Sequence, residues 1–285
     1  QAFSVAFDSL SAIIADSPAD YRRTSEASLD NISLEKVIDY YSLCCRPEGS
    51  VITVVGDITP ETVHSMAEYY FADWSNPEEA LPQLEIPRFT SAPGDTVVTF
   101  MDGRMQGTVL IAAQAPGFEM PDFAAFSVMN TILGRGIGSR LGHSVRDEQG
   151  LAYGVGSWAS NMDSSGVFTA YLSTLADYVP QATVSVTNEM ERISNENVQD
   201  IELRLAKANS VGRQAMSGMS YQGLAGGLTT LESTGRPLDW NNQYLRQVLE
   251  LTPEQLREAA ATYVIPGEWF GSIAGNVTEE DLAVE

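Results

Sequence analysis

The sequence predicts an α+β fold, in which an antiparallel or mixed sheet is covered by helices. Two observations carry this prediction. Segments in which apolar and polar residues alternate, as in strands, are concentrated between residues 96 and 174. Longer segments with helical periodicity follow them. In addition, one helix–strand–helix pattern occurs near both ends of the chain. The 285 residues, 44% of them hydrophobic, suffice for one large or two medium domains with a buried core.

The strand candidates come in two pairs. Residues 96–102 (TVVTFMD) and 107–116 (GTVLIAAQAP) alternate like paired strands around a glycine-containing turn. Residues 151–160 and 166–174 predict a hairpin that turns across NMDSSG.

Helices are expected between and after these strands. Residues 120–134 have Pro121 near the start and Gly134 at the end, which are favourable helix boundaries. A shorter helix is expected at 139–148 (SRLGHSVRDE). Two further helical stretches follow at 178–193 and 198–216, so the predicted strands precede helices that cover one face of the sheet.

A weak repeat links the two ends of the chain. Residues 32–63 align without a gap with residues 251–282 at an offset of 219. Each copy predicts a capped helix, a proline break, a short strand (51–55 or 270–274) and a second capped helix. The identical pairs are Glu35/Glu254, Pro47/Pro266, Gly56/Gly275, Thr59/Thr278 and Glu61/Glu280.

The repeat predicts the domain organisation. The segment 76–95 contains four prolines and little periodicity, so it is expected to be an interdomain linker. Residues 96–285 then form a whole domain, and residues 1–75 match only the C-terminal part of such a domain. By this alignment, a complete first copy is expected to begin roughly 120 residues before Gln1.

Composition excludes several kinds of partner and site. The formal charge of −22, from 38 acidic and 16 basic residues, argues against nucleic acid as a partner. No apolar run is long enough to predict a membrane span, and the compartment stays open, with bacterial periplasm and cytoplasm both plausible.

Cys44 and Cys45 are adjacent and predict neither a disulfide nor a zinc site. His64 and His143 form no H-x-x-E-H motif, so no metal site is expected in this chain.

The most specific motif is LGRGIGSRLGHSVRDEQGLAYGVGS, residues 133–157. Its glycines follow a helix rather than a strand, which is the wrong order for a phosphate-binding loop. Arg146 and Tyr153 stand seven positions apart on either side of Gly150. With YYSLCCRPEGSVITVVGDITPETV (40–63) and the FTAYL strand, this segment resembles the M16 metallopeptidases, the pitrilysin, insulinase and mitochondrial-processing-peptidase family.

The resemblance implies an M16 peptidase-like (LuxS/MPP-like) domain, the zinc-free half of a two-domain clamshell. In that family the other domain carries zinc on H-x-x-E-H and a distal Glu. Here the resemblance implies that Arg146 and Tyr153 are catalytic, because they would reach the peptide substrate and the tetrahedral intermediate across the cleft. It also implies a substrate-binding loop at Gly134, Gly136, Gly138 and Ser139. Zinc is expected in an M16 domain of the same gene product or of a partner subunit, and this chain alone is expected to be inactive.

Each of these assignments has an alternative. An Arg near a helix end often pairs with a local acidic residue, and a strand Tyr is often a core residue with a hydrated hydroxyl. The glycines of 134–138 could form only a tight turn. At the level of function, the alternative is an inactive M16-like partner or peptide-binding scaffold. The presence of both Arg146 and Tyr153 favours a domain that still serves catalysis.

Overall fold

The computed structural model describes most of the chain. The described residues are 1–14, 24–81, 94–136, 138–162 and 164–282. Most of the predicted linker, residues 82–93, lies outside them.

The described residues form two compact units. The larger unit contains 1–14, 94–210 and 246–282, and the smaller unit contains 24–81 and 211–245. Both units therefore combine segments that are distant in the sequence. The domain boundaries expected from the repeat, at 75 and 96, stay a prediction.

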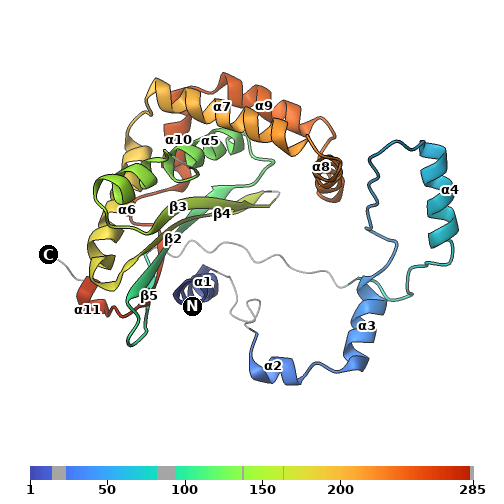
Figure 1. Cartoon of the computed structure of the whole chain (residues 1–285), viewed down its shortest axis with the longest axis horizontal. Helices are drawn as coiled ribbons and strands as arrows, with labels where there is room; N and C mark the ends of the chain where they lie inside the picture. Colours follow the sequence, from blue (N-terminus) through green and yellow to red (C-terminus); the bar gives the residue numbers. More distant parts are fainter. Residues whose placement is uncertain (15–23, 82–93, 137, 163, 283–285) are drawn as a thin grey trace. The chain divides into compact units, whose positions relative to one another are not determined.

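The larger unit is built on a five-stranded mixed sheet with the order β1-β5-β2-β4-β3 (Figure 1). The pair β1–β5 is parallel, and the other three neighbouring pairs are antiparallel. The α+β class with a mixed sheet is thus confirmed. The strands are β1 (Thr96–Phe100), β2 (Gln106–Pro116), β3 (Gly154–Asn161), β4 (Ser165–Leu175) and β5 (Phe270–Gly275).

One strand pairing predicted from the sequence is wrong, and the other is confirmed. β3 and β4 form the expected hairpin, with Gly154 opposite Ser173 and Asn161 opposite Gly166. β1 and β2 do not pair, because β5 lies between them and bonds to both. β5 is buried along its whole length. A central position satisfies its backbone groups on both edges, which an edge strand cannot do.

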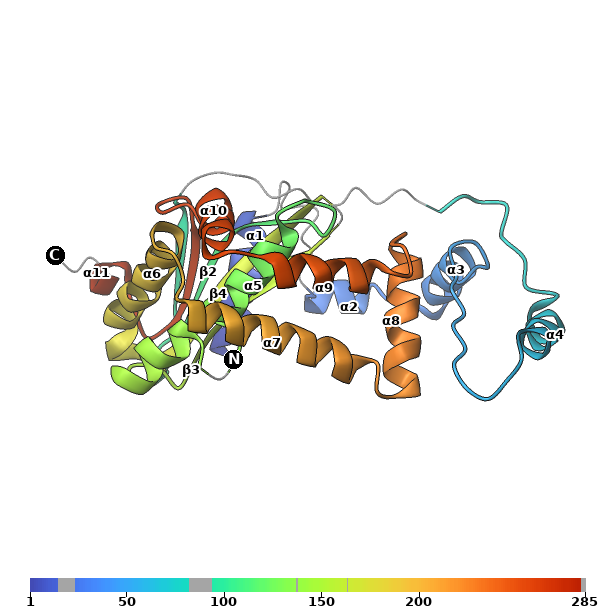
Figure 2. The ribbon, with the colours of Figure 1, turned by 90° about the horizontal axis from the view of Figure 1, so that it is seen from above.

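Three helices pack together against one face of the sheet (Figures 1 and 2). They are α5 (Phe123–Leu133), α6 (Val179–Asn195) and α10 (Pro253–Tyr263). Each contributes fully buried apolar side chains to the core, such as Met129, Met190 and Leu256. This layer confirms the helices expected at 120–134 and 178–193.

The opposite face of the sheet carries α1 (Ala2–Ile14), which the sequence did not predict there. Ala6 and Leu10 of α1 are buried against Leu110 and Ala112 of β2 and against β5. Successive strand residues point to opposite faces, and Val109 and Ile111 are buried as well. Because β2 is therefore apolar on both faces, it needs a cover on both.

The remaining helical elements are mostly short. They are α2 (Glu26–Asp30), α3 (Leu34–Cys44), α4 (Pro60–Phe71), η1 (Gly142–Glu148), η2 (Ala176–Tyr178), α7 (Asp200–Ser217), α8 (Tyr221–Ser233), α9 (Trp240–Glu250) and α11 (Glu279–Leu282). α7 confirms the helix expected at 198–216. Cys44 ends α3, Cys45 follows it, and both thiols are free.

Three of the four helix starts predicted in the repeat have the predicted cap, whereas the hydroxyl of the fourth residue, Thr278, donates to Asp281 Oδ2 at 2.8 Å. The hydroxyls of Ser33, Thr59 and Thr252 each accept a hydrogen bond from the N–H three residues later, as expected for N-caps. The strand expected at 51–55 is wrong, whereas 270–275 forms β5. No strand among the described residues pairs with 51–55, and a strand requires a neighbour to satisfy its backbone.

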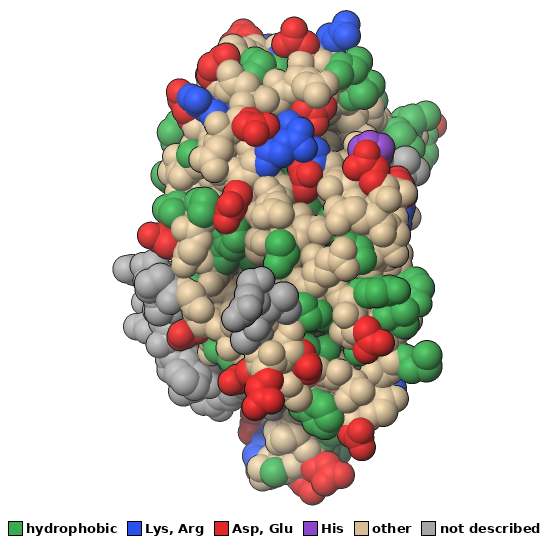
Figure 3. Space-filling view, turned by 90° about the vertical axis from the view of Figure 1, so that its left-hand side faces the viewer, with side chains coloured by type: hydrophobic (Ala, Val, Ile, Leu, Met, Phe, Trp, Pro, Cys, Tyr) green, Lys and Arg blue, Asp and Glu red, His purple; other side chains and the backbone are tan. Residues whose placement is uncertain are grey.

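The surface of the larger unit carries its acidic residues in a scattered arrangement on the face drawn in Figure 3. Apolar and uncharged groups separate them, and basic side chains are fewer. None of the helices in the described residues has the length and hydropathy of a membrane span.

Candidate functional site

Arg146 lies on η1, a seven-residue π-helix at 142–148. Its side chain is 47% exposed, and its Nε donates to Asp147 Oδ1 at 2.9 Å. The hydrogen bond from Arg146 lowers the pKa of Asp147, and the same bond raises the pKa of Arg146. The local acidic partner considered from the sequence is therefore present, although both members of the pair are open to solvent.

Hydrogen bonds to both neighbouring elements fix the backbone after Arg146. Gly150 has a φ of +65°, which favours glycine, and its N–H donates to the Arg146 carbonyl at 3.1 Å. The N–H of Leu151 donates to the Val145 carbonyl at 3.0 Å. The buried hydroxyl of Thr174 donates to the Leu151 carbonyl. The turn between η1 and the sheet is thus tied to both elements.

Tyr153 ends this turn and immediately precedes β3. Its N–H donates to the Ser173 carbonyl of β4 at 2.9 Å, whereas its side chain is 63% exposed. The core position considered as an alternative is therefore wrong for this ring. The structure places Arg146 and Tyr153 on one anchored turn with both side chains exposed, and Arg146 pairs with Asp147 rather than with Tyr153.

Gly134 lies where the end of α5 touches β3. A Cβ on Gly134 would be 2.3 Å from Ser157 Oγ and 2.5 Å from Ser157 N. The Gly134 carbonyl accepts from the Ser157 N–H at 3.1 Å, and the buried Ser157 hydroxyl donates to Asn130 Oδ1 at 2.6 Å. A close approach of two elements therefore accounts for glycine at this position without any ligand.

Gly136, Gly138 and Ser139 complete the predicted substrate loop. Both glycines have positive φ, 117° and 84°, and a Cβ on either would meet nothing within 4 Å. Ser139 is buried, and its hydroxyl accepts from the Gly142 N–H at 3.3 Å. Its side chain therefore serves the start of the following helical turn. Substrate contact by this loop stays a prediction.

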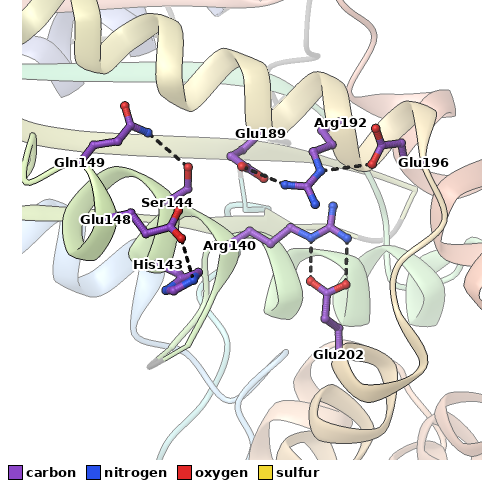
Figure 4. A network of polar contacts seen from close by, with 9 residues as sticks. All are labelled: Arg140, His143, Ser144, Glu148, Gln149, Glu189, Arg192, Glu196 and Glu202. Carbon is purple, nitrogen blue, oxygen red and sulfur yellow. Dashed lines mark hydrogen bonds and ion pairs between the residues drawn. The ribbon is translucent and has the colours of Figure 1, made fainter.

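A partly buried ionic network lies next to this loop, and the sequence analysis missed it. Arg140 donates to both carboxylate oxygens of Glu202 on α7, at 2.7 and 2.9 Å (Figure 4). This hydrogen bonding by Arg140 lowers the pKa of Glu202. On α6, Arg192 contacts Glu189 at 3.3 Å and Glu196 at 3.2 Å.

One signal in the sequence could have revealed part of this network. The buried positions of α6 include Ala182, Val186, Glu189, Met190 and Ile193. Glu189 therefore occupies the apolar stripe of the helix, where an acidic residue needs a partner. No sequence pattern indicated that Glu202 pairs with Arg140, because Glu202 lies 62 residues away on another helix.

The network borders a cavity of about 540 Å³. Its lining residues are Gly138, Arg140, His143, Ser144, Asp147, Glu148, Glu189, Arg192, Gln199 and Glu202. Arg146 and Tyr153 are not among them. The larger unit therefore has two polar features, an exposed turn and a recessed cavity, and Asp147 belongs to both.

Neither histidine lies in a metal-binding arrangement. His64 Nε2 is 3.3 Å from Glu68 and His143 Nε2 is 3.2 Å from Glu148, and all four side chains are mostly exposed. The described ranges contain no group of three or more His, Cys, Asp or Glu side chains that could hold a metal ion.

Comparison with known proteins identifies the family. The model of the peptidase M16 inactive domain matches residues 31–210, more than half of the chain. The chain belongs to this family. The resemblance stated from the glycine-rich loop and the Arg–Tyr spacing is thereby confirmed.

The relatives of this M16 chain include proteins named as zinc proteases. An uncharacterized zinc protease of Mycobacterium leprae is 24% identical over 262 residues, which cover 88% of this chain and 57% of the relative. One from Rickettsia bellii is 30% identical over 166 residues, covering 56% of this chain and 37% of the relative. The chain thus matches only part of the length of these relatives, 57% of one and 37% of the other.

Solved structures share the fold. A peptidase M16 inactive domain from Pseudomonas fluorescens is 25% identical with a TM-score of 0.83, and the match covers 96% of this chain and 66% of that one. A protease from Helicobacter pylori has a TM-score of 0.79 at 20% identity, covering 88% and 61%. The M16 fold therefore extends over nearly all of the chain.

Proposed function

We infer that this chain is the C-terminal portion of an M16-type zinc metalloendopeptidase. It closes over a peptide substrate and supplies Arg146 and Tyr153 to an active site in a zinc-bearing M16 domain. Membership of the M16 family and the zinc-protease names of its relatives support the enzyme class. The observation that carries the residue assignment is the anchored turn, which presents both side chains to solvent.

The two side chains suit the charge that develops during peptide hydrolysis. When water attacks a peptide carbonyl, negative charge accumulates on the carbonyl oxygen, and donors already in place lower the barrier. A guanidinium remains charged at any working pH and offers several N–H groups, and a phenol offers one O–H. A zinc ion in the other domain would activate the water and polarise the carbonyl. This chain's part is to orient the peptide and donate to the developing oxyanion.

The edge of the sheet beside Tyr153 offers a way to hold an extended peptide. β3 is the outermost strand on this side, so its outer backbone groups are available to an added strand where nothing covers them. Part of this edge is already covered, because the Gly134 carbonyl accepts from the Ser157 N–H. A substrate strand would therefore pair beside the rest of β3, close to Tyr153.

The smaller unit supplies an argument for the zinc-bearing domain as a partner. Val37 and Val54 are 51% and 48% exposed, whereas their repeat equivalents Leu256 and Ile273 are 0% and 3% exposed. Equivalent positions thus form core in one copy and surface in the other. Exposed apolar side chains at core positions favour packing against another folded segment. We propose that this segment belongs to the zinc-bearing M16 domain, in the same gene product or in a partner subunit.

The test is turnover of a peptide by the chain assembled with a zinc-bearing M16 domain. Arg146→Ala should lower kcat by about 10²- to 10³-fold, the usual loss for one oxyanion donor, with unchanged zinc content. Arg204→Ala is the matched control, because Arg204 is also exposed but lies on α7. Unchanged turnover in the Arg146 variant would refute the assignment. Peptide binding without any turnover, in an assembly whose zinc is bound, would favour the inactive scaffold instead.

A further inference from the structure

Two buried ionic side chains in the cavity between η1, α6 and α7 are each only half paired. Arg140 is 9% exposed and uses Nε and Nη2 to hold Glu202, while its Nη1 is buried without a hydrogen-bond partner. Glu189 is 8% exposed and accepts from Arg192 through Oε1, while its Oε2 is likewise buried without a partner. Buried charged atoms are normally satisfied, so each unpaired atom requires an explanation.

The existing salt bridges hold the unpaired atoms in place. Glu202 is itself fixed by the Gln199 N–H, which donates to its Oε2 at 2.8 Å. Arg140 is therefore clamped in a two-point pair, which sets the plane of its guanidinium. Figure 4 shows its third nitrogen pointing away from Glu202, toward the side of the network that carries Glu189 and Arg192. The two residues that line the cavity thus keep one N–H donor and one carboxylate oxygen buried without a partner.

The chemistry of these two atoms limits the ligand. A simple cation would satisfy Glu189 but leave the Arg140 donor unpaired, and a simple anion would do the reverse beside several carboxylates. A group with a donor and an acceptor on adjacent atoms satisfies both. A donor that carries positive charge suits the Glu189 carboxylate better than a neutral one, whereas Asp147 and Glu148 of the lining already contact Arg146 and His143. The volume of about 540 Å³ can hold a small molecule or the end of a chain.

We propose that this cavity binds an α-ammonium group together with the carbonyl or carboxylate oxygen next to it. The ammonium donates to Glu189 Oε2, and the oxygen accepts from Arg140 Nη1. A free α-amino acid and the amino terminus of a peptide share this chemistry. Arg146 and Tyr153 do not line this cavity, although Asp147, the partner of Arg146, does, and the proposal does not depend on their role in catalysis.

A ligand series on the unmodified chain tests the proposal by isothermal titration calorimetry. L-alanine carries both groups as a free amino acid, and L-alaninamide carries them as a peptide amino terminus does. N-acetyl-L-alaninamide and propionate each lack the ammonium. We expect binding only of ligands with the ammonium. Stronger binding of L-alaninamide identifies a peptide terminus, and stronger binding of L-alanine identifies a free amino acid. No heat from any ligand at millimolar concentrations, or equal binding of all four, would overturn the proposal.

Two isosteric variants locate the binding. Glu189→Gln keeps the shape of the side chain and removes the charge that meets the ammonium, so the affinity should fall at least about tenfold. Glu191→Gln changes an exposed carboxylate on the same helix and should leave the affinity unchanged. Circular dichroism of both variants checks that they are folded. Full affinity in a folded Glu189→Gln protein would place the ligand elsewhere and refute the site.

Discussion

Replacing Gly134 by Ala tests whether this glycine is needed for packing or for substrate binding. The φ of Gly134 is not positive, so the substitution introduces no backbone strain. The added Cβ, however, would lie 2.5 Å from a backbone nitrogen and 2.8 Å from a backbone carbon of β3. Backbone atoms cannot move aside as a flexible side chain can, so α5 and β3 must separate.

The contacts at Gly134 indicate how much free energy of unfolding this separation would cost. Overpacking of this kind costs about 1–3 kcal/mol. The buried hydrogen bond between Ser157 and Asn130 spans the same contact, and its loss adds about 1 kcal/mol. We therefore expect Gly134→Ala to destabilise the chain by about 3 kcal/mol, which lowers Tm by on the order of 10 °C.

Thermal denaturation followed by circular dichroism measures this effect. Two further variants serve as a control and as a test of which contact causes it. Gly212→Ala changes a helix-interior glycine whose Cβ would meet nothing within 4 Å, so it should stabilise by about 0.5–1 kcal/mol. Adding Ser157→Gly to Gly134→Ala removes the hydroxyl contact but keeps the backbone contact, and should restore only part of the loss. A Gly134→Ala protein with unchanged Tm would refute the packing argument and leave substrate contact as the reason for the glycine.

Two further predictions concern charge and the repeat. Since the pKa of Glu202 is lowered in the folded chain, its ionised form contributes stability above the unfolded pKa of about 4.3, and this contribution is lost as pH falls through the folded pKa. Urea denaturation of the wild type should therefore show a larger loss of stability on acidification than Glu202→Gln, and equal losses would contradict the pairing with Arg140. In the repeat, Leu256→Asp buries an unpaired charge and should unfold the larger unit, whereas Val37→Asp at the equivalent exposed position should change Tm by no more than a surface substitution does. Val37→Asp should instead weaken binding of a zinc-bearing M16 domain in a pull-down, and unweakened binding would contradict the proposed contact.

Elements defined by local signals were predicted well from the sequence. α5 follows from Pro121 and Gly134 at its ends, and the β3–β4 hairpin follows from alternation on both sides of a short turn. The N-caps at Ser33, Thr59 and Thr252 depend only on residues within one helical turn. Such signals involve only residues close together in the chain, so the local sequence contains all the information needed to predict them.

Features that depend on distant segments were missed. The position of β5 between β1 and β2 joins residues more than 150 positions apart, and the alternation of β1 and β2 says only that each needs a neighbour. The failed strand at 51–55 has the same cause, since its apolar pattern resembles that of β5 but the described residues offer it no partner. The docking of α1 was also invisible, because an apolar stripe indicates that a helix is buried but not against which face.

The candidate site combines these two kinds of information. The sequence located Arg146 and Tyr153 through a motif, but it gave no role to Arg140, six positions earlier in the same segment. The structure separates them by burial and by partner. Arg140 forms a largely buried pair with Glu202. Removing Glu202 would therefore leave the charge of Arg140 buried and unpaired. Arg146 pairs only with its sequence neighbour, and both side chains are about half exposed, so water screens their attraction. A guanidinium held this weakly can exchange Asp147 for a substrate oxygen at little cost, whereas Arg140 can offer a ligand only the one nitrogen that Glu202 leaves free. We therefore propose an exposed catalytic role for the arginine at one position and a fixed binding role for the arginine at the other.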